Sequence, residues 1–213
     1  MSSRRFPGKV LAPFNGIPIV RHVVDAAKQV LPPECVTVLT SRDPSDDPLA
    51  EYLRSIGQLV FRGDLNDVFF RFRQGLERFP CTWMLRLSAD SPLLEPAVLS
   101  AVLDRIGKDQ VDLVTTIYPR TFPKGQNAEL VRTETFLSLP TADLSPDDRE
   151  HVTAYFYRHP DRFRILNIDS GNPSLAETGL AVDTVEDLQR LEGLGIRGWQ
   201  GTWADCVSMQ VPS

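Results

Sequence analysis

The sequence predicts an α/β fold built on a mostly parallel β-sheet. Short aliphatic runs alternate with amphipathic stretches of about ten to fifteen residues through the first half of the chain, which is the pattern of successive βαβ units. The 213 residues are 42% hydrophobic and 24% charged, close to an average globular domain. A chain of this length can fold without a disulfide or a metal ion. We expect one α/β domain over residues 1–194 and a C-terminal tail over 195–213.

Four strand–helix steps are expected in the first half. Apolar residues fall on one helical face over 20–30, 46–56, 68–76 and 98–106, and continuous apolar runs predict strands over 36–39, 59–61, 83–87 and 111–117. Pro18 precedes the first helix and Gly57 follows the second, positions that these residues favour.

The alternation ends after Ile117, so the second half is predicted to be an α+β elaboration of the same sheet. Turn residues predict loops over 119–125 and 172–178. Apolar runs predict strands over 129–131, 163–168 and 180–182. Helices are expected over 146–157 and from Thr184 through Leu191, with Thr184 as the N-cap.

Charge and cysteine content exclude several classes of protein. The 23 basic and 28 acidic residues give a net charge of −5, which argues against a general nucleic-acid or anionic-membrane binder. The N-terminus has no apolar leader core, and no apolar run approaches the length of a membrane span. Three scattered cysteines form no disulfide framework and no thiolate zinc motif, which favours a cytoplasmic protein with reduced thiols.

The first candidate site is the segment 2–9, which is rich in hydroxyl groups and cations. Ser3, Arg5, Gly8 and Lys9 could bind a triphosphate, because phosphates need neutralising cations and backbone N–H groups that can approach closely. The glycine spacing is not that of a Walker A loop. On local grounds alone, a solvated basic turn is the commoner interpretation.

Two further candidates are carboxylates that follow apolar runs. Asp90 follows the predicted strand 83–87, and Asp183 follows the predicted strand 180–182. Ligands of open α/β sheets bind beyond the carboxyl ends of the strands, where Asp can hold Mg²⁺. Alternatively, each Asp could cap the following helix. Metal binding and capping are about equally favoured for Asp90, whereas capping is favoured for Asp183. If the fold brings the two together, they form a paired-carboxylate metal site.

In order along the chain, these segments resemble the cytidylyltransferases typified by spore coat polysaccharide biosynthesis protein F, relatives of the 3-deoxy-manno-octulosonate and acylneuraminate cytidylyltransferases. The opening pattern of that family, Q-A-R-M-x-S-[ST]-R-L-P-G-K-V-L, is matched by Ser3, Arg5, Pro7, Gly8, Lys9, Val10 and Leu11. Six more segments match in order: DDPLA at 46–50, FRGDLNDV at 61–68, RLSADSPLLEP at 86–96, PRTFPKG at 119–125, DREHVT at 148–153 and VDT at 182–184.

The resemblance implies a three-layer, mononucleotide-binding fold like that of nucleotide-diphospho-sugar transferases. It also implies an enzyme that joins CTP to a sugar acid and releases pyrophosphate, with Mg²⁺ as cofactor. Arg5, Lys9 and Asp90 would be catalytic, and Asp90 and Asp183 would ligate Mg²⁺. We therefore expect these two carboxylates to converge at the carboxyl ends of their strands. The nucleotide would be bound by Ser3, Arg5, Gly8, Lys9 and Arg86. Separately from the resemblance, a homo-oligomer is a possible assembly.

Some family features are absent from the sequence. The usual first strand, approximately I-x-A-I-I-Q-A-R, does not precede the phosphate loop, so the expected sheet lacks a central strand. We expect the two strands on either side of the missing one to close the gap between them. A strand supplied by a partner chain is the second choice, and a strand from residues 207–211 is the third. Lys124 and Asn127 replace acidic residues of the sugar-side loop, so the family's acceptor preference does not carry over.

Two alternatives to this enzyme remain open from the sequence. One is a glycosyltransferase on a similar fold, which would favour a D-x-D motif where this chain has Asp90-Ser91-Pro92. The other is a nucleotide-binding homologue without catalytic activity.

Overall fold

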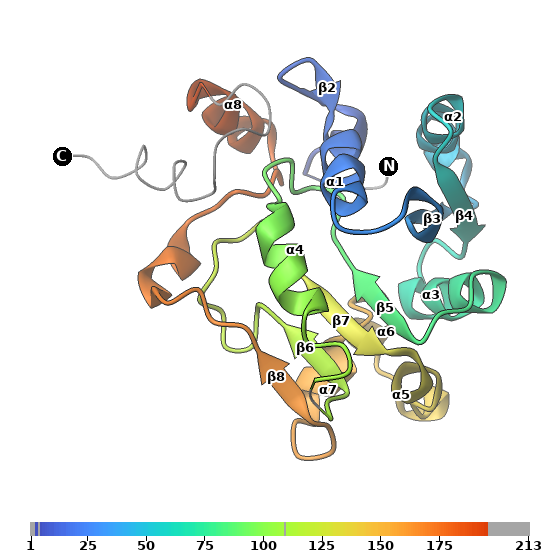
Figure 1. Cartoon of the computed structure of the whole chain (residues 1–213). Helices are drawn as coiled ribbons and strands as arrows, with labels where there is room; N and C mark the ends of the chain where they lie inside the picture. Colours follow the sequence, from blue (N-terminus) through green and yellow to red (C-terminus); the bar gives the residue numbers. More distant parts are fainter. Residues whose placement is uncertain (1–2, 4, 109, 196–213) are drawn as a thin grey trace.

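The structure is a computed structural model that describes residues 3, 5–108 and 110–195, and it has the predicted α/β class (Figure 1). The chain enters through the short helix η1 (Lys9–Leu11) and a small hairpin of β1 (Pro13–Phe14) and β2 (Ile17–Pro18). Helix α1 (Ile19–Lys28) then leads through η2 (Pro33–Cys35) to the first strand of the larger α/β layer. The predicted tail over 195–213 lies outside the described residues except for Gly195.

The first sheet fragment is a parallel pair. Strands β3 (Thr37–Ser41) and β4 (Leu59–Gly63) are joined through η3 (Pro44–Asp46) and α2 (Asp47–Ser55), as the βαβ pattern predicts. Asp46 is 4% exposed and fixes this connection by accepting hydrogen bonds from Thr40 Oγ1 at 2.6 Å and from the backbone N of Ser41 at 2.8 Å. Burial alone would raise the pKa of Asp46, but the hydrogen bonds that its carboxylate accepts, these two among them, outweigh the effect of burial and hold the pKa well below the usual range.

The second sheet fragment has the strand order β5-β7-β6-β8. Helix α3 (Val68–Arg78) leads into β5 (Trp83–Arg86), and α4 (Pro96–Leu103) leads towards β6 (Leu113–Thr115). Strand β7 (Glu129–Arg132) runs antiparallel to both β5 and β6, whereas β8 (Ile165–Asn167) runs parallel to β6. The sheet is therefore more mixed than predicted, because a loop rather than a crossover helix joins β6 to β7.

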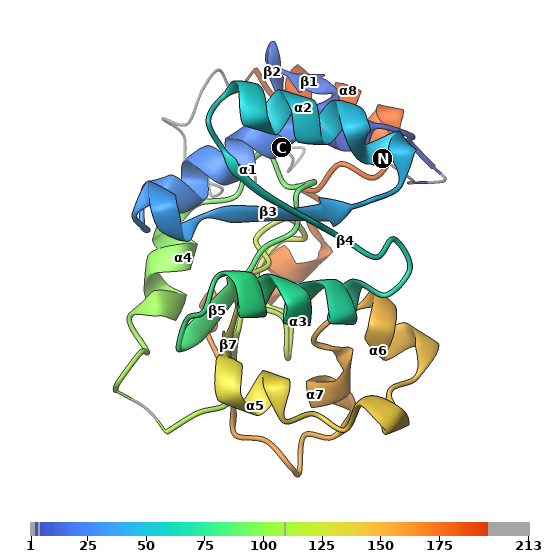
Figure 2. The same ribbon diagram turned by 90° about the vertical axis from the view of Figure 1, so that its right-hand side faces the viewer.

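Helices cover both faces of the sheet fragments, which gives the predicted three layers. Figure 2 shows α1 and α2 on one side of β3 and β4 and α3 on the other side. The apolar face of α1 packs with α2 in one core cluster that includes Val20, Val24, Leu49 and Leu53. On the opposite side α3 packs with residues of the later helices in a second cluster.

The second half contains short helices joined by turns and loops. The elements are α5 (Thr133–Leu137), η4 (Thr141–Asp143), α6 (Pro146–Glu150), α7 (Ala154–Arg158), η5 (Pro173–Glu177) and α8 (Val185–Gly193). The single helix predicted over 146–157 is wrong, because Val152 has a φ of 25° and separates α6 from α7. Ser145 and Asp148 form a capping box at the start of α6, so the acidic cluster there caps a helix.

The strand predicted over 180–182 is also wrong. Leu180 and Val182 are fully buried, as the apolar run indicated, but within the described part of the chain this segment pairs with no strand. Its backbone N–H groups bond to two loops instead: Leu180 N donates to Lys124 O at 2.6 Å, and Val182 N donates to Asp90 O at 2.8 Å. An apolar run of three residues signals burial without specifying what the backbone pairs with.

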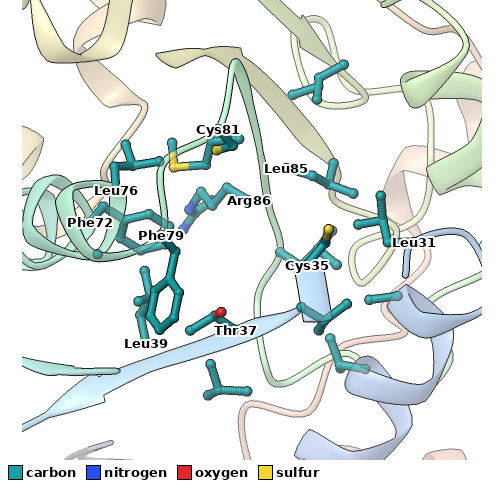
Figure 3. Close-up of a pocket in the computed structure, with 18 of the residues that line it drawn as sticks. Leu31, Cys35, Thr37, Leu39, Phe72, Leu76, Phe79, Cys81, Leu85 and Arg86 are labelled. Carbon is teal, nitrogen blue, oxygen red and sulfur yellow. The ribbon is translucent and has the colours of Figure 1, made fainter. Parts of the chain in front are cut away.

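A gap separates the two sheet fragments, which we call the β3–β5 gap. Strand β3 pairs only with β4, and β5 pairs only with β7, in the part of the chain that the structure describes. A cavity of about 570 Å³ lies between them, lined by residues 35–39 and 83–89 and by side chains of α1 and α3. Figure 3 shows Thr37 and Leu39 of β3 on one side of this cavity, with Leu85 and Arg86 of β5 across from them.

The expected closure of the neighbouring strands is therefore wrong. Successive residues on both strands line the cavity, so the unpaired backbone edges of β3 and β5 face each other across it. Side chains of α1 and α3 line this cavity as well. Among the described residues, no helix is long and apolar enough to cross a membrane.

Candidate nucleotide and metal site

The centre of the candidate site is a lysine between two aspartates. Lys9 Nζ lies 2.9 Å from Asp90 Oδ2 and 2.9 Å from Asp183 Oδ1. The two carboxylate oxygens are therefore at most twice that distance apart, close enough to contact one cation together. The prediction that Asp90 and Asp183 converge is confirmed.

Loops at one edge of the structure position these three side chains. Asp90 follows the carboxyl end of β5, and its backbone oxygen accepts the bond from Val182 N that places the next residue, Asp183, beside it. Directly after Asp183, Thr184 and Asp187 form a capping box that begins α8. The capping function suggested for Asp183 thus belongs to its neighbours, which leaves its carboxylate to face Lys9.

The electrostatic environment favours the charged forms of both Lys9 and Asp183. Burial lowers the pKa of Lys9, but the charges and hydrogen bonds of Asp90 and Asp183 outweigh this effect and raise the pKa above its ordinary value. Burial likewise raises the pKa of Asp183, but the hydrogen bond and charge of Lys9, with the charge of Arg5, lower it overall. Lys9 and Asp183 are therefore both ionised at neutral pH.

The predicted phosphate segment lies against the same pair. Arg5 Nη2 is 3.1 Å from Asp183 Oδ1, and its side chain is 66% exposed. Ser3 Oγ accepts a hydrogen bond from the backbone N of Phe6 at 3.3 Å, which makes a tight turn. Gly8 has a φ of 75°, a conformation that glycine adopts without strain, and it turns the chain into η1 so that Lys9 faces the carboxylates.

Arg86 lies in a different cluster from the other predicted nucleotide-binding residues. Its guanidinium forms an ion pair with Glu129, directly opposite it on β7. The side chain of Glu129 is only 1% exposed, and its Oε1 accepts hydrogen bonds from Thr153 Oγ1 at 2.7 Å and from the hydroxyl of Tyr157 at 2.6 Å. Burial and the neighbouring Glu129 carboxylate raise the pKa of Tyr157, so its hydroxyl remains a donor.

Sequence reasoning missed this Glu129 cluster, although the sequence contains a signal for it. Glu129 interrupts the aliphatic run 128–131, and Arg86 ends the aliphatic run 83–85. A charged residue within a buried strand needs a partner of opposite charge, since an unpaired buried charge is costly. Because Glu129 and Arg86 have opposite charges and both lie on predicted strands, an ion pair between them could have been predicted from the sequence.

The loop 119–127 packs against the segment before Asp183 and carries two cations, Arg120 and Lys124. Gly125 approaches the segment before Asp183 so closely that a Cβ there would lie 2.7 Å from the carbonyl carbon of Leu180. On the other side, Gln126 Oε1 accepts a hydrogen bond from the backbone N of Glu95 at 2.9 Å. In the same loop, Arg120 Nη1 donates to Asn127 Oδ1 at 2.7 Å, and burial lowers the Arg120 pKa.

The donor set of the pair fits Mg²⁺ and does not fit zinc. No group of three or more His, Cys, Asp or Glu side chains that could hold a metal ion occurs among the described residues. Mg²⁺ needs only one or two protein carboxylates, because water and substrate phosphate oxygens complete its shell. The ammonium group of Lys9 already contacts both carboxylates at one point, so the two aspartates can share a cation.

Comparisons with known proteins agree on one family. A model described as Cytidylyltransferase matches residues 1–191. Spore coat polysaccharide biosynthesis protein SpsF of Bacillus subtilis is 26% identical over 200 residues, which cover 91% of this chain and 82% of that protein. The 3-deoxy-manno-octulosonate cytidylyltransferase of Geobacter sulfurreducens is 28% identical over 162 residues, which cover 75% of this chain and 59% of that protein.

Solved structures show the same fold. A cytidylyltransferase from Leptospira borgpetersenii superposes with a TM-score of 0.90 at 25% identity, covering 98% of this chain and 89% of that chain. A structure of CMP:2-keto-3-deoxy-manno-octonic acid synthetase complexed with CTP superposes with a TM-score of 0.67 at 19% identity. It covers 91% of this chain and 94% of that chain, and it supports the fold alone.

Proposed function

Because this chain belongs to the cytidylyltransferase family and is a CTP-dependent nucleotidyltransferase, we propose that it joins CTP to a sugar acid and releases pyrophosphate. The product would serve the synthesis of a cell-surface polysaccharide or glycan. The observation that carries this proposal is the contact of Lys9 with both Asp90 and Asp183, beside the exposed Arg5. Two cations and two carboxylates at one edge suit a metal–triphosphate substrate.

The reaction is an in-line displacement at the α-phosphorus of CTP. A hydroxyl oxygen of the sugar forms a bond to that phosphorus, the bond between the α-phosphorus and the bridging oxygen breaks, and pyrophosphate leaves with the bonding electrons. The hydroxyl proton passes to solvent or to a nearby base. Catalysis comes mainly from positioning the reactants and from neutralising charge on the phosphate oxygens.

Each residue of the site has a function in this scheme. Arg5 and Lys9 bind the triphosphate, and the turn made by Ser3 and Gly8 brings them to it. Asp90 and Asp183 hold Mg²⁺, which, when bound, supplies positive charge to the triphosphate oxygens. The exposed, unpaired Cys35 and Cys81 are consistent with a reducing, cytoplasmic setting for the reaction.

Arg120 is the proposed contact for the carboxylate of the acceptor. It lies on the loop that touches the segment before Asp183, and its planar guanidinium suits bidentate binding of a carboxylate. Among the described residues, the guanidinium donates a hydrogen bond to the neutral Asn127, and the charge of the Glu129 carboxylate also acts on it. A sugar acid would supply a carboxylate in direct contact with this partly buried cation.

Nucleotide preference tests the proposal. With Mg²⁺ present, CTP is expected to raise the melting temperature more than ATP, GTP or UTP at equal concentration. A ligand at about 100 times its Kd adds about 2.7 kcal/mol of stability, which corresponds to roughly 5–10 °C for a domain of this size. Differential scanning fluorimetry measures the shift, and an equal or larger shift with ATP or GTP would count against a cytidylyltransferase.

Replacing Arg120 by alanine is expected to raise the KM for the sugar acid by about 10- to 100-fold, because a charge-assisted hydrogen bond to a carboxylate contributes about 1.5–3 kcal/mol. The KM for CTP should change by less than about threefold. Steady-state pyrophosphate release measures both constants, with Arg105→Ala, an exposed arginine after α4, as the control. A larger change in the CTP constant than in the acceptor constant would place Arg120 on the nucleotide side.

A further inference from the structure

Lys9 occupies the position that a metal ion would need in order to contact both carboxylates. Its Nζ lies 2.9 Å from an oxygen of each aspartate, and its side chain is only 14% exposed. Arg5 adds a second cation at 3.1 Å from Asp183. Two positive and two negative side chains therefore already balance each other in this cluster.

A divalent cation cannot enter this arrangement without moving Lys9. An ammonium group and a metal ion bound to the same two oxygens would lie within contact distance of each other, and their repulsion would be weakly screened in a partly buried site. A metal ion alone would also leave the cluster with excess positive charge. Entry of the metal thus requires a new anionic partner for the lysine.

We propose that Lys9 is an internal counter-cation that keeps the Asp90–Asp183 pair from binding a divalent cation until a nucleoside triphosphate draws its ammonium group away. This inference rests on the proposed function of the same site. The lysine has a flexible four-carbon stem and three rotatable donors, so its Nζ can transfer from carboxylate to phosphate oxygens. The triphosphate supplies the negative charge that lets Lys9, Arg5 and the metal remain together. Metal and nucleotide therefore bind with strong mutual dependence.

Binding of Mn²⁺ without turnover tests the proposal. Free Mn²⁺ is measured by electron paramagnetic resonance with the wild-type protein, alone and with α,β-methylene-CTP, which cannot release pyrophosphate. The Mn²⁺ that the analogue chelates in the absence of protein is measured separately and subtracted. Mn²⁺ alone should bind at least about tenfold more weakly than with the analogue. In Lys9→Met, a neutral side chain of similar length, Mn²⁺ alone should bind at least about tenfold tighter than in wild type.

Two variants make the result specific. Lys108→Met removes a positive charge from an exposed position after α4 and should bind Mn²⁺ as wild type does. Adding Asp183→Asn to Lys9→Met should abolish the gain, because it removes one of the two ligands. Circular dichroism establishes that each variant is folded; if Lys9→Met is not, the wild-type comparison decides alone.

Equal Mn²⁺ affinity in wild type and Lys9→Met would overturn the proposal, as would equal affinity of wild type with and without the analogue. The proposed function can fail separately. If Lys9→Met binds Mn²⁺ more tightly but wild type transfers no cytidylyl group to any acceptor, the inference about Lys9 stands and the proposed reaction does not.

Discussion

Replacing Asp90 by alanine is expected to reduce pyrophosphate release by at least about a thousandfold, or about 4 kcal/mol of transition-state stabilisation. The variant loses one of the two carboxylates that converge on Lys9 and would hold Mg²⁺ on the triphosphate. CTP binding should weaken far less, because Arg5 and Lys9 remain. Asp90→Asn should have nearly the same effect, since it keeps the shape of the side chain and removes the charge.

Pyrophosphate release is measured in a coupled assay at saturating CTP, and CTP binding is measured separately by calorimetry. Asp104→Asn, an exposed aspartate at the end of α4, is the matched control and should retain wild-type rates. Substantial pyrophosphate release by both Asp90 variants would remove Asp90 from the metal site. A loss of CTP binding as large as the loss of rate would instead assign Asp90 to nucleotide binding.

Filling the β3–β5 gap is expected to stabilise the protein and tighten CTP binding. A five-residue aliphatic segment joined ahead of Met1 could pair with both unpaired edges and pack against α1 and α3, whose side chains line the two faces. Burial of aliphatic side chains contributes about 1.5–3 kcal/mol each, and each ladder hydrogen bond contributes about 1 kcal/mol. Ordering the segment costs about 1–2 kcal/mol per residue, which leaves a net gain of several kcal/mol.

The melting temperature should rise by more than about 5 °C, and CTP should bind at least about tenfold tighter, equivalent to 1.4 kcal/mol. The affinity gain follows because the added strand would lead directly into the segment that carries Arg5 and Lys9. A segment of the same length with prolines at alternate positions is the control, because proline cannot donate to a strand ladder. Equal melting temperatures and equal CTP affinities for the two proteins would show that the gap does not accept a strand.

Sequence periodicity was sufficient to predict the helices and strands in the first half of the fold but not those in the second half. The helices predicted over 46–56 and 68–76 are α2 and α3. Each has one apolar face, and α2 is also ended by Gly57. The two helices lie on opposite sides of β3 and β4 (Figure 2). The predicted helix over 146–157 fails because its break depends on the conformation of Val152, which no local pattern marks. Periodicity reports burial, and tertiary contacts decide the backbone in short segments.

The residues of the candidate site could be predicted from the sequence more completely than the backbone structure around them. Asp90 and Asp183 lie 93 positions apart in the sequence, yet they were expected together because both follow apolar runs. The reason given for Asp183 was only partly right, since the residues before it form a buried loop segment and no strand. The position of Lys9 between the two carboxylates could not be predicted, because it depends on how the turn at Gly8 sets η1 against two distant loops.

Phosphorus NMR on the protein with CTP, Mg²⁺ and a panel of sugar acids tests the central claim most directly. The account predicts that the three CTP signals give way to one phosphodiester signal and to pyrophosphate, in equal amounts and only when both a sugar acid and Mg²⁺ are present. A glycosyltransferase or a nucleotide-binding homologue would produce no such phosphodiester from CTP. CTP that stays intact with every acceptor, or breaks down to inorganic phosphate alone, would contradict the account.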